Sequence, residues 1–320
     1  MVLNFIVFLL FVFSSIMAYA APGNLYTDSL RHFSIASFAE DSFTTVIPFS
    51  RSGNLILLKA KADSIEGNFI LDTGAPHLVL NITYFRDHPT TEHHDEQQNS
   101  INGASPVVVR TTVKQLSFGR MDYFHLNADL VNLGHIENSR GVKIIGLLGM
   151  DLFRKCEMII DYEKNLVYLH RIGKKESSKY KHQMLMDTSA YRTIPIDITD
   201  NRIIATTYLA GKKLKLVVDC AAESKILDSR LPDKIFETVT ITKRVLLTGS
   251  NNKKVEALYG NLATMKIGNQ DFGNMPVLIT NLEGSCFSYS GCVDGVLGFD
   301  FLSLHKIGFN FVRRKMYIWK

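Results

Sequence analysis

The stretch Ile70-Leu-Asp-Thr-Gly-Ala-Pro-His77 ends an apolar run in one carboxylate, which turn-forming residues follow at once. A buried carboxylate is costly when it is charged and has no hydrogen-bond donors around it. Thr73 offers a hydroxyl group, and Gly74 has no side chain, so backbone N–H groups can approach the carboxylate closely. We therefore expect Asp72 to lie at the end of a strand, on a loop that keeps a buried acid hydrogen-bonded.

The second half of the chain repeats this stretch as Val217-Val-Asp-Cys-Ala-Ala-Glu-Ser224. Asp219 follows Asp72 at an offset of 147 residues (219 − 72 = 147). Other segments recur at nearly the same offset: Asn54-Leu-Ile-Leu and Asn201-Arg-Ile-Ile, then Ile145-Gly-Leu-Leu-Gly149 and Asp294-Gly-Val-Leu-Gly298. A repeat of this length has the size of a domain, so we expect two duplicated lobes.

Short runs of valine, isoleucine, threonine and aromatic residues alternate with Gly, Asn or Asp along the chain, which favours an all-β protein. Each half reads as two strands, the Asp turn, further strands and a short helix after Leu-Leu-Gly or Val-Leu-Gly. The predicted fold is therefore all-β, with two β-barrel-like lobes and a cleft between them.

A pseudo-two-fold relation between such lobes would bring the two Asp loops together. Two carboxylates that share one site cannot both ionise, so one of them holds a proton. One can then act as a base on a water molecule while the other acts as an acid toward a carbonyl group. Asp72 and Asp219 are the candidate pair.

The motif Asp72-Thr-Gly-Ala75, with apolar residues before it and Leu147-Leu-Gly149 downstream, resembles that of the retropepsin-like and pepsin-like aspartic peptidases. Gly149-Met-Asp-Leu152 and Gly298-Phe-Asp-Phe301 are similar to the bacterial exported type, which carries two retropepsin-like lobes in one chain. The resemblance covers roughly residues 45–320. It implies a bilobal acid-protease fold and aspartic endopeptidase activity.

Carried over to this sequence, the resemblance makes Asp72 and Asp219 catalytic and Thr73, Gly74, Cys220 and Ala221 their supporting loop residues. Thr73 would hydrogen-bond across the lobe interface. Gly103 and Gly249 would lie on flaps that close over an extended peptide, which binds as an added strand. Ala75 replaces the hydroxyl residue of pepsins, so the resemblance implies activity nearer neutral pH.

The second loop departs from the family pattern at two positions. Cys220 stands where threonine is usual, and because a thiol is a weak donor we expect the cross-lobe hydrogen-bond pair to be compromised. Ala221 stands where glycine is usual, and its Cβ is expected to crowd the approach of the backbone amides.

Three interpretations therefore stay open. The first is a single-chain aspartic endopeptidase that uses both Asp residues. The second is a catalytically impaired pseudo-protease that keeps the cleft and binds peptides without cutting them. The third is an enzyme in which the first lobes of two copies pair. A monomer is the expected state, with a dimer as the alternative.

The net charge of +5 is modest and no polybasic block stands out, so neither nucleic acid nor an anionic membrane is an expected partner. Thr91-Glu-His-His-Asp-Glu-Gln-Gln98 contains metal-type side chains but lacks the spacing of a zinc site, so we interpret it as a solvated loop. No metal or cofactor is expected. The expected partner is a peptide or protein substrate.

Residues 1–20 are typical of a secretory signal peptide: an apolar run from Phe5 to Phe13 is followed by Ala18-Tyr-Ala20. The run is short for a membrane span, which needs about 20 residues, so a stable membrane anchor is not expected. We predict an exported protein, periplasmic or extracellular. The predicted division is an N-terminal extension at 21–42, lobes at 43–172 and 191–320, and a linker at 173–190.

The chain has four cysteines. In an exported protein Cys286 and Cys292 could close a short loop as a disulfide, or they could both be free thiols. Cys156 and Cys220 lie in unrelated contexts, and no bond between them is expected.

Overall fold

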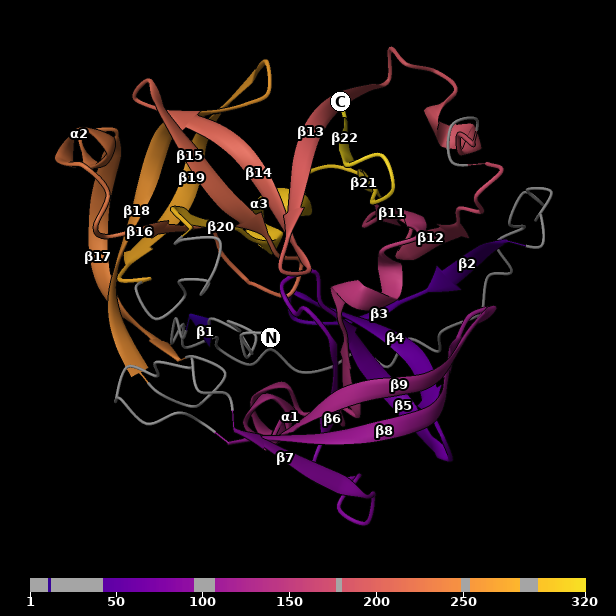
Figure 1. Cartoon of the computed structure of the whole chain (residues 1–320). Helices are drawn as coiled ribbons and strands as arrows, with labels where there is room; N and C mark the ends of the chain where they lie inside the picture. Colours follow the sequence, from indigo (N-terminus) through magenta and orange to yellow (C-terminus); the bar gives the residue numbers. More distant parts are fainter. Residues whose placement is uncertain (1–10, 13–42, 95–106, 177–179, 249–253, 283–292) are drawn as a thin grey trace, which may run out of the picture.

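The computed structural model describes residues 11–12, 43–94, 107–176, 180–248, 254–282 and 293–320 (Figure 1). Apart from Phe11–Val12, the predicted signal peptide and N-terminal extension lie outside the described residues. So do Gly103 and Gly249, which are predicted to lie on flaps, and the cysteines Cys286 and Cys292. Within the described ranges, no helix has both the length and the apolar character needed to cross a membrane. Cys156 and Cys220 are buried free thiols, as expected.

The N-terminal lobe is an eight-stranded sheet in the order β3-β4-β5-β10-β6-β9-β8-β7. Its strands are β3 (Ser50–Ser52), β4 (Leu55–Ala62), β5 (Ile65–Leu71), β6 (Leu78–Asn81), β7 (Thr90–His94), β8 (Val107–Phe118), β9 (Met121–Val131) and β10 (Gly146–Leu148). Helix α1 (Gly134–Arg140) follows β9, and the 3-10 helix η1 (Met150–Phe153) follows β10. The short helix predicted after Leu-Leu-Gly is therefore present.

The C-terminal lobe repeats this arrangement. Its strands are β14 (Arg202–Leu209), β15 (Lys212–Val218), β16 (Ile226–Asp228), β17 (Val239–Thr248), β18 (Lys254–Ile267), β19 (Gln270–Thr280) and β20 (Gly295–Leu297), with helices α2 (Asp233–Phe236) and α3 (Phe299–Leu302). The two-residue strand β1 (Phe11–Val12) pairs with β17.

Six strands join the lobes, namely β2 (Thr44–Pro48), β11 (Cys156–Asp161), β12 (Leu166–Arg171), β13 (Tyr191–Thr199), β21 (Ile307–Asn310) and β22 (Lys315–Trp319). Antiparallel pairing of β11 with β21 links the two halves of the chain (Figure 1). Across this pairing, Asn310 Nδ2 donates to Glu157 Oε2 at 2.7 Å inside the protein. Through β13 these strands continue into the sheet of the C-terminal lobe.

The segment predicted as a linker, 173–190, contains the 3-10 helix η2 (Gln183–Leu185). It packs onto the joining strands, because Leu185 is buried and the ring of Tyr180 stacks on that of His170. The described part of this segment therefore packs against the fold at Tyr180 and Leu185.

Corresponding strands pair in the same way in both lobes, which confirms the predicted duplication. Strand β10 lies parallel to β5, with Gly146 opposite Phe69, and β20 lies parallel to β15, with Gly295 opposite Leu216. Asp72 directly follows β5, and Asp219 directly follows β15. One apolar cluster contains residues of both lobes, including Leu71 and Val218, so the two Asp loops rest on a common core.

Candidate active site

Asp72 is buried at the end of β5, where backbone amides surround its carboxylate. Its own N–H donates to the Leu148 carbonyl at 3.1 Å, which fixes the loop to β10. Oδ1 accepts hydrogen bonds from the N–H groups of Gly74 at 2.8 Å and Ala75 at 2.9 Å. The loop is thus the buried, hydrogen-bonded site that the sequence predicts.

Asp219 has the equivalent environment in the other lobe. Its N–H donates to the Leu297 carbonyl at 3.0 Å, and Oδ1 accepts from Ala221 N at 2.8 Å and Ala222 N at 3.2 Å. The expectation that Ala221 would crowd out the backbone amides is therefore wrong. Ala221 is not among the residues with positive φ, and its side chain packs into the apolar cluster of the N-terminal lobe with Leu57 and Ala75.

The two loops meet at Gly74. A Cβ atom placed on Gly74 would lie 2.3 Å from Asp219 Oδ2 and 2.5 Å from Asp219 Cγ. Such distances lie far inside van der Waals contact, so the Asp219 carboxylate occupies the space that a side chain at position 74 would need. The structure therefore brings Asp72 and Asp219 into one site within a single chain.

Residues 73 and 220 hold the loops together by exchanging hydrogen bonds across the interface. Thr73 Oγ1 donates to the Val218 carbonyl at 2.9 Å and accepts from Cys220 N at 2.9 Å. Cys220 Sγ in turn donates to the Leu71 carbonyl at 3.2 Å. The expectation that cysteine would compromise this cross-lobe pair of hydrogen bonds is wrong as to geometry, because the Cys220 thiol forms the bond that corresponds to that of the Thr73 hydroxyl. The thiol is still a weaker donor than a hydroxyl group.

This duplicated geometry agrees with the comparison to protein families. The family model described as aspartyl protease matches residues 58–152 and again residues 205–301, together more than half of the chain. The chain belongs to the aspartyl protease family. Each match spans one Asp loop and ends in the helix after the Leu-Leu-Gly or Val-Leu-Gly turn, as the sequence repeat predicts. The protein is thus a two-lobed, retropepsin-like member of the family.

The crystal structure of basic 7S globulin from soybean is similar to this aspartyl protease family member. The alignment covers 87% of this chain and 95% of that chain, with 10% sequence identity and a TM-score of 0.46. No curated protein matches the chain.

The electrostatics of this family member's site favour protonated carboxyl groups. Burial, followed by repulsion from the Asp219 carboxylate, raises the pKa of Asp72 well above its ordinary value, against the lowering effect of the Ala75 and Gly74 amides. Burial also raises the pKa of Asp219, against the amides of Ala221 and Ala222 and the charge of Arg202. Two neighbouring acids whose pKa values are both raised are suited to sharing one proton.

Cys220 does not have the properties of a nucleophile in this site. Its side chain is buried, and burial together with the charges of Asp219 and Asp72 raises the pKa of the thiol far above neutrality. A thiol that stays protonated is a poor nucleophile. Cys220 therefore acts as a hydrogen-bonding part of the loop.

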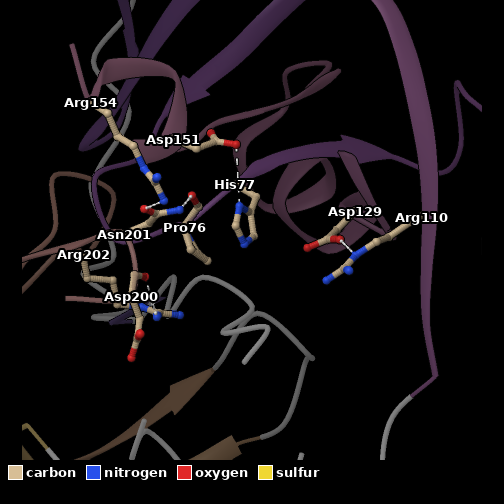
Figure 2. A network of polar contacts seen from close by, with 9 residues as sticks. All are labelled: Pro76, His77, Arg110, Asp129, Asp151, Arg154, Asp200, Asn201 and Arg202. Carbon is tan, nitrogen blue, oxygen red and sulfur yellow. Dashed lines mark hydrogen bonds and ion pairs between the residues drawn. The ribbon is translucent and has the colours of Figure 1, made fainter. Parts of the chain in front are cut away.

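A second set of polar contacts fixes the Asp72 loop against the C-terminal lobe (Figure 2). Asn201 Nδ2 donates to the Pro76 carbonyl at 3.1 Å, and Arg154 in turn donates to Asn201 Oδ1. On the other side of the interface, the Arg140 guanidinium pairs with the Glu223 carboxylate, and both side chains are largely buried. Asn201 of the C-terminal lobe thus holds the Asp72 loop, and Arg140 of the N-terminal lobe holds the Asp219 loop.

Asp151 and Asp300 follow the Gly turns, and the sequence favours a structural interpretation of both. Asp151 Oδ2 lies 3.6 Å from His77 Nδ1, which Figure 2 shows, and Asp300 Oδ2 lies 3.2 Å from Lys225 Nζ. Each acid thus contacts a basic residue a few positions after the aspartate loop of its own lobe. These contacts fix the helix after each turn to the loop beside it.

Sequence reasoning missed Arg202, Asn201, Arg140 and Glu223. One signal was available, because the repeat aligns Asn201-Arg202 with Asn54-Leu55 and so places a charged residue where the first lobe has an apolar one. The pairing of Arg140 with Glu223 has no such signal, since it depends on how the lobes dock.

Proposed function

We propose that this protein is an aspartic endopeptidase in which Asp72 and Asp219 share one proton and activate a water molecule. The observation that carries the proposal is the contact of the Asp219 carboxylate with Gly74 of the Asp72 loop. Membership of the aspartyl protease family supports a proteolytic reaction.

The proposed mechanism follows from the two carboxyl groups. The ionised member takes a proton from water as it attacks the peptide carbonyl carbon, and the protonated member donates its proton to the carbonyl oxygen. In the second step the newly protonated member donates its proton to the leaving nitrogen as the C–N bond breaks, and the other member takes a proton from a hydroxyl group of the tetrahedral intermediate. The pair thus holds one proton throughout and ends in its starting state. Buried backbone amides around each Oδ1 hold the carboxyl groups in place without taking part in the transfer.

The sequence predicts flaps at Gly103 and Gly249, which lie in the chain between the paired strands β7 and β8 and between the paired strands β17 and β18. We propose that an extended peptide binds beneath them as an added strand, which is a common mode of peptide recognition. The proposed partner is therefore a peptide or protein, and the proposed location is outside the cytoplasm.

A peptide-binding pseudo-protease is the second candidate, and the Cys220 thiol is the observation that favours it. A sulfur donor holds the Asp219 loop less firmly than a hydroxyl group would. The intermolecular alternative, in which the first lobes of two copies pair, has less support, because Asp72 already meets Asp219 of its own chain.

The test is digestion of a peptide library by the purified protein at several pH values, with mass spectrometry of the new termini. Wild-type protein should generate internal cleavages, and the Asp72→Asn variant should generate none. Retention of peptides by both proteins without new termini would instead support the pseudo-protease. The exposed Asp87→Asn change is the matched control and should cut like the wild type.

A further inference from the structure

Arg202 is a buried arginine whose strand register places it beside the aspartate pair. It is the first residue of β14, and its side chain is 1% exposed. In the β14–β15 ladder Ile204 lies opposite Val217. Extending this antiparallel register by two residues, beyond the last pair of the ladder, brings Arg202 near Asp219, with whose carboxylate its charge interacts.

The first lobe has the same register but a different residue. Leu57 lies opposite Ile70, so the same extension sets Leu55 opposite Asp72. Leu55 is fully buried in an apolar cluster. The duplication therefore gives one aspartate an apolar neighbour and the other a cation.

A tight turn holds Arg202 in this position. Asp200 and Asn201 both have positive φ, 47° and 57°, as in two-residue hairpin turns, and they join β13 to β14 with Thr199 opposite Arg202. Arg202 Nη1 donates to the Asp200 carbonyl at 3.2 Å, and Asn201 donates a hydrogen bond to the Pro76 carbonyl (Figure 2). The arginine is thus anchored on both sides.

The guanidinium stays charged despite its burial. Burial lowers the pKa of Arg202 to about 10, while the charges of Asp200, Asp72 and Asp219 act in the opposite direction. Its charge in turn opposes the rise that burial causes in the pKa of Asp219.

We propose that Arg202 is a positioning residue for the Asp72–Asp219 pair, and that its buried positive charge keeps the pair singly ionised down to a lower pH than two buried carboxyl groups alone would allow. The consequence for activity rests on the proposed function. The effect on the protonation of the pair does not require that the protein cleave peptides.

Other charged or titratable groups of the described residues also face the pair or its neighbours. Cys220 lies in the Asp219 loop and interacts with both aspartates, and Tyr162, which follows β11, interacts with Cys220. The pKa values of both Cys220 and Tyr162 are raised by burial, so both stay neutral over the acidic range. Charged groups near these residues include Asp200, beside Arg202, and Arg51, near Tyr162. Arg154 donates to Asn201, the residue before Arg202.

The test is a carboxyl ¹³C NMR titration of the full chain labelled at aspartate, from about pH 3 to about pH 9, a range that brackets ordinary and raised carboxyl pKa values. The signals of Asp72 and Asp219 are identified with the Asp72→Asn and Asp219→Asn variants. Arg202→Met removes the charge, and Arg202→Lys keeps it. Leu55→Met is the matched control at the equivalent position of the other lobe.

In Arg202→Met, the apparent pKa for loss of the first proton from the pair should rise by about 1–3 units, the range expected when an opposite charge within about 6 Å of a carboxyl group is removed. Arg202→Lys and Leu55→Met should titrate like the wild type. Should the methionine variant not fold, Arg202→Leu introduces the residue that the first lobe uses and has the same expected shift.

The proposal about Arg202 would be overturned if the titration curve of Arg202→Met superimposed on that of the wild type. If the protein cleaves peptides, the acidic limb of the pH–rate profile should move by the same amount as the titration. A shifted titration in a protein that cuts nothing would leave the Arg202 proposal standing and overturn the proposed function. Cleavage of peptides by the wild type together with an unshifted titration of Arg202→Met would leave the proposed function standing and overturn the Arg202 proposal.

Discussion

The carboxylate of Asp219 lies against the α-carbon of Gly74, so that a methyl group added at position 74 would meet Asp219 Oδ2 at 2.3 Å. The residues come from different lobes, and their contact is possible only because position 74 has no side chain. Both loops are buried and hydrogen-bonded to neighbouring strands, which leaves little room for adjustment.

Gly74→Ala should therefore push the two loops apart. We expect a loss of about 1–3 kcal/mol in the free energy of unfolding, the usual cost of overpacking, and loss of peptide cleavage. Urea denaturation and a peptide assay measure the two effects. Gly173→Ala is the control, because its Cβ would meet only the end of the Glu176 side chain, at 3.2 Å. Wild-type activity in Gly74→Ala would show that the loops do not touch.

The reciprocal hydrogen bonds of Thr73 and Cys220 lead to a second prediction. Cys220→Thr should strengthen the bond to the Leu71 carbonyl, and Cys220→Val, of nearly the same shape, should remove it. The threonine variant should exceed the valine variant by about 1 kcal/mol in the free energy of unfolding, the net value of one hydrogen bond. Equal stabilities in urea would argue against a hydrogen bond at this position.

The raised pKa of Asp72 predicts a pH-dependent stability. Because its pKa in the folded protein lies above the ordinary value of 3.8, the folded state binds more protons than the unfolded state between those two values. This contribution to stability is complete below about pH 4 and is lost as the pH rises through the folded pKa. Asp72→Asn should remove it.

Urea unfolding at a series of pH values measures this difference. The free energy of unfolding of the wild type should fall relative to that of Asp72→Asn as the pH rises from about 4 toward neutrality. Asp87→Asn, at an exposed carboxylate, should run parallel to the wild type. Parallel curves for Asp72→Asn and the wild type would mean that Asp72 has no raised pKa.

The Arg140–Glu223 pair gives a prediction about how the lobes dock. Arg140→Met leaves the Glu223 carboxylate without its guanidinium partner, which should cost about 2 kcal/mol or more of stability. The double variant Arg140→Met/Glu223→Met should regain much of that loss, because no lone charge is left buried. If the two changes are simply additive in urea unfolding, the two side chains do not interact.

The repeat in the sequence was enough to predict the two lobes, the position of each Asp loop and the helix after each Gly turn. These features depend on local residue types, such as Asp72-Thr-Gly and Leu-Leu-Gly, and on their spacing. The predictions for Cys220 and Ala221 are wrong, because the hydrogen bond of the Cys220 thiol and the space for the Ala221 methyl group both depend on residues of the other lobe. The Leu71 carbonyl lies within reach of the sulfur, and an apolar cluster receives the Ala221 methyl group.

Arg202 illustrates the same limit in another way. Its residue type was visible in the repeat, but its relation to Asp219 follows only from the register of β14 and β15. The Arg140–Glu223 contact requires the relative placement of the lobes, which the alternation of residue types along a strand does not determine.

The most direct test of the central claim is the value of kcat/KM for Asp219→Asn beside that of the wild type, on one peptide that the wild type cuts. Because both carboxyl groups are proposed to move protons in the same step, the single change should reduce kcat/KM by about a thousandfold or more, leaving binding of the peptide intact. Cleavage by Asp219→Asn at close to the wild-type rate would contradict a shared pair and would leave Asp72 to act without Asp219.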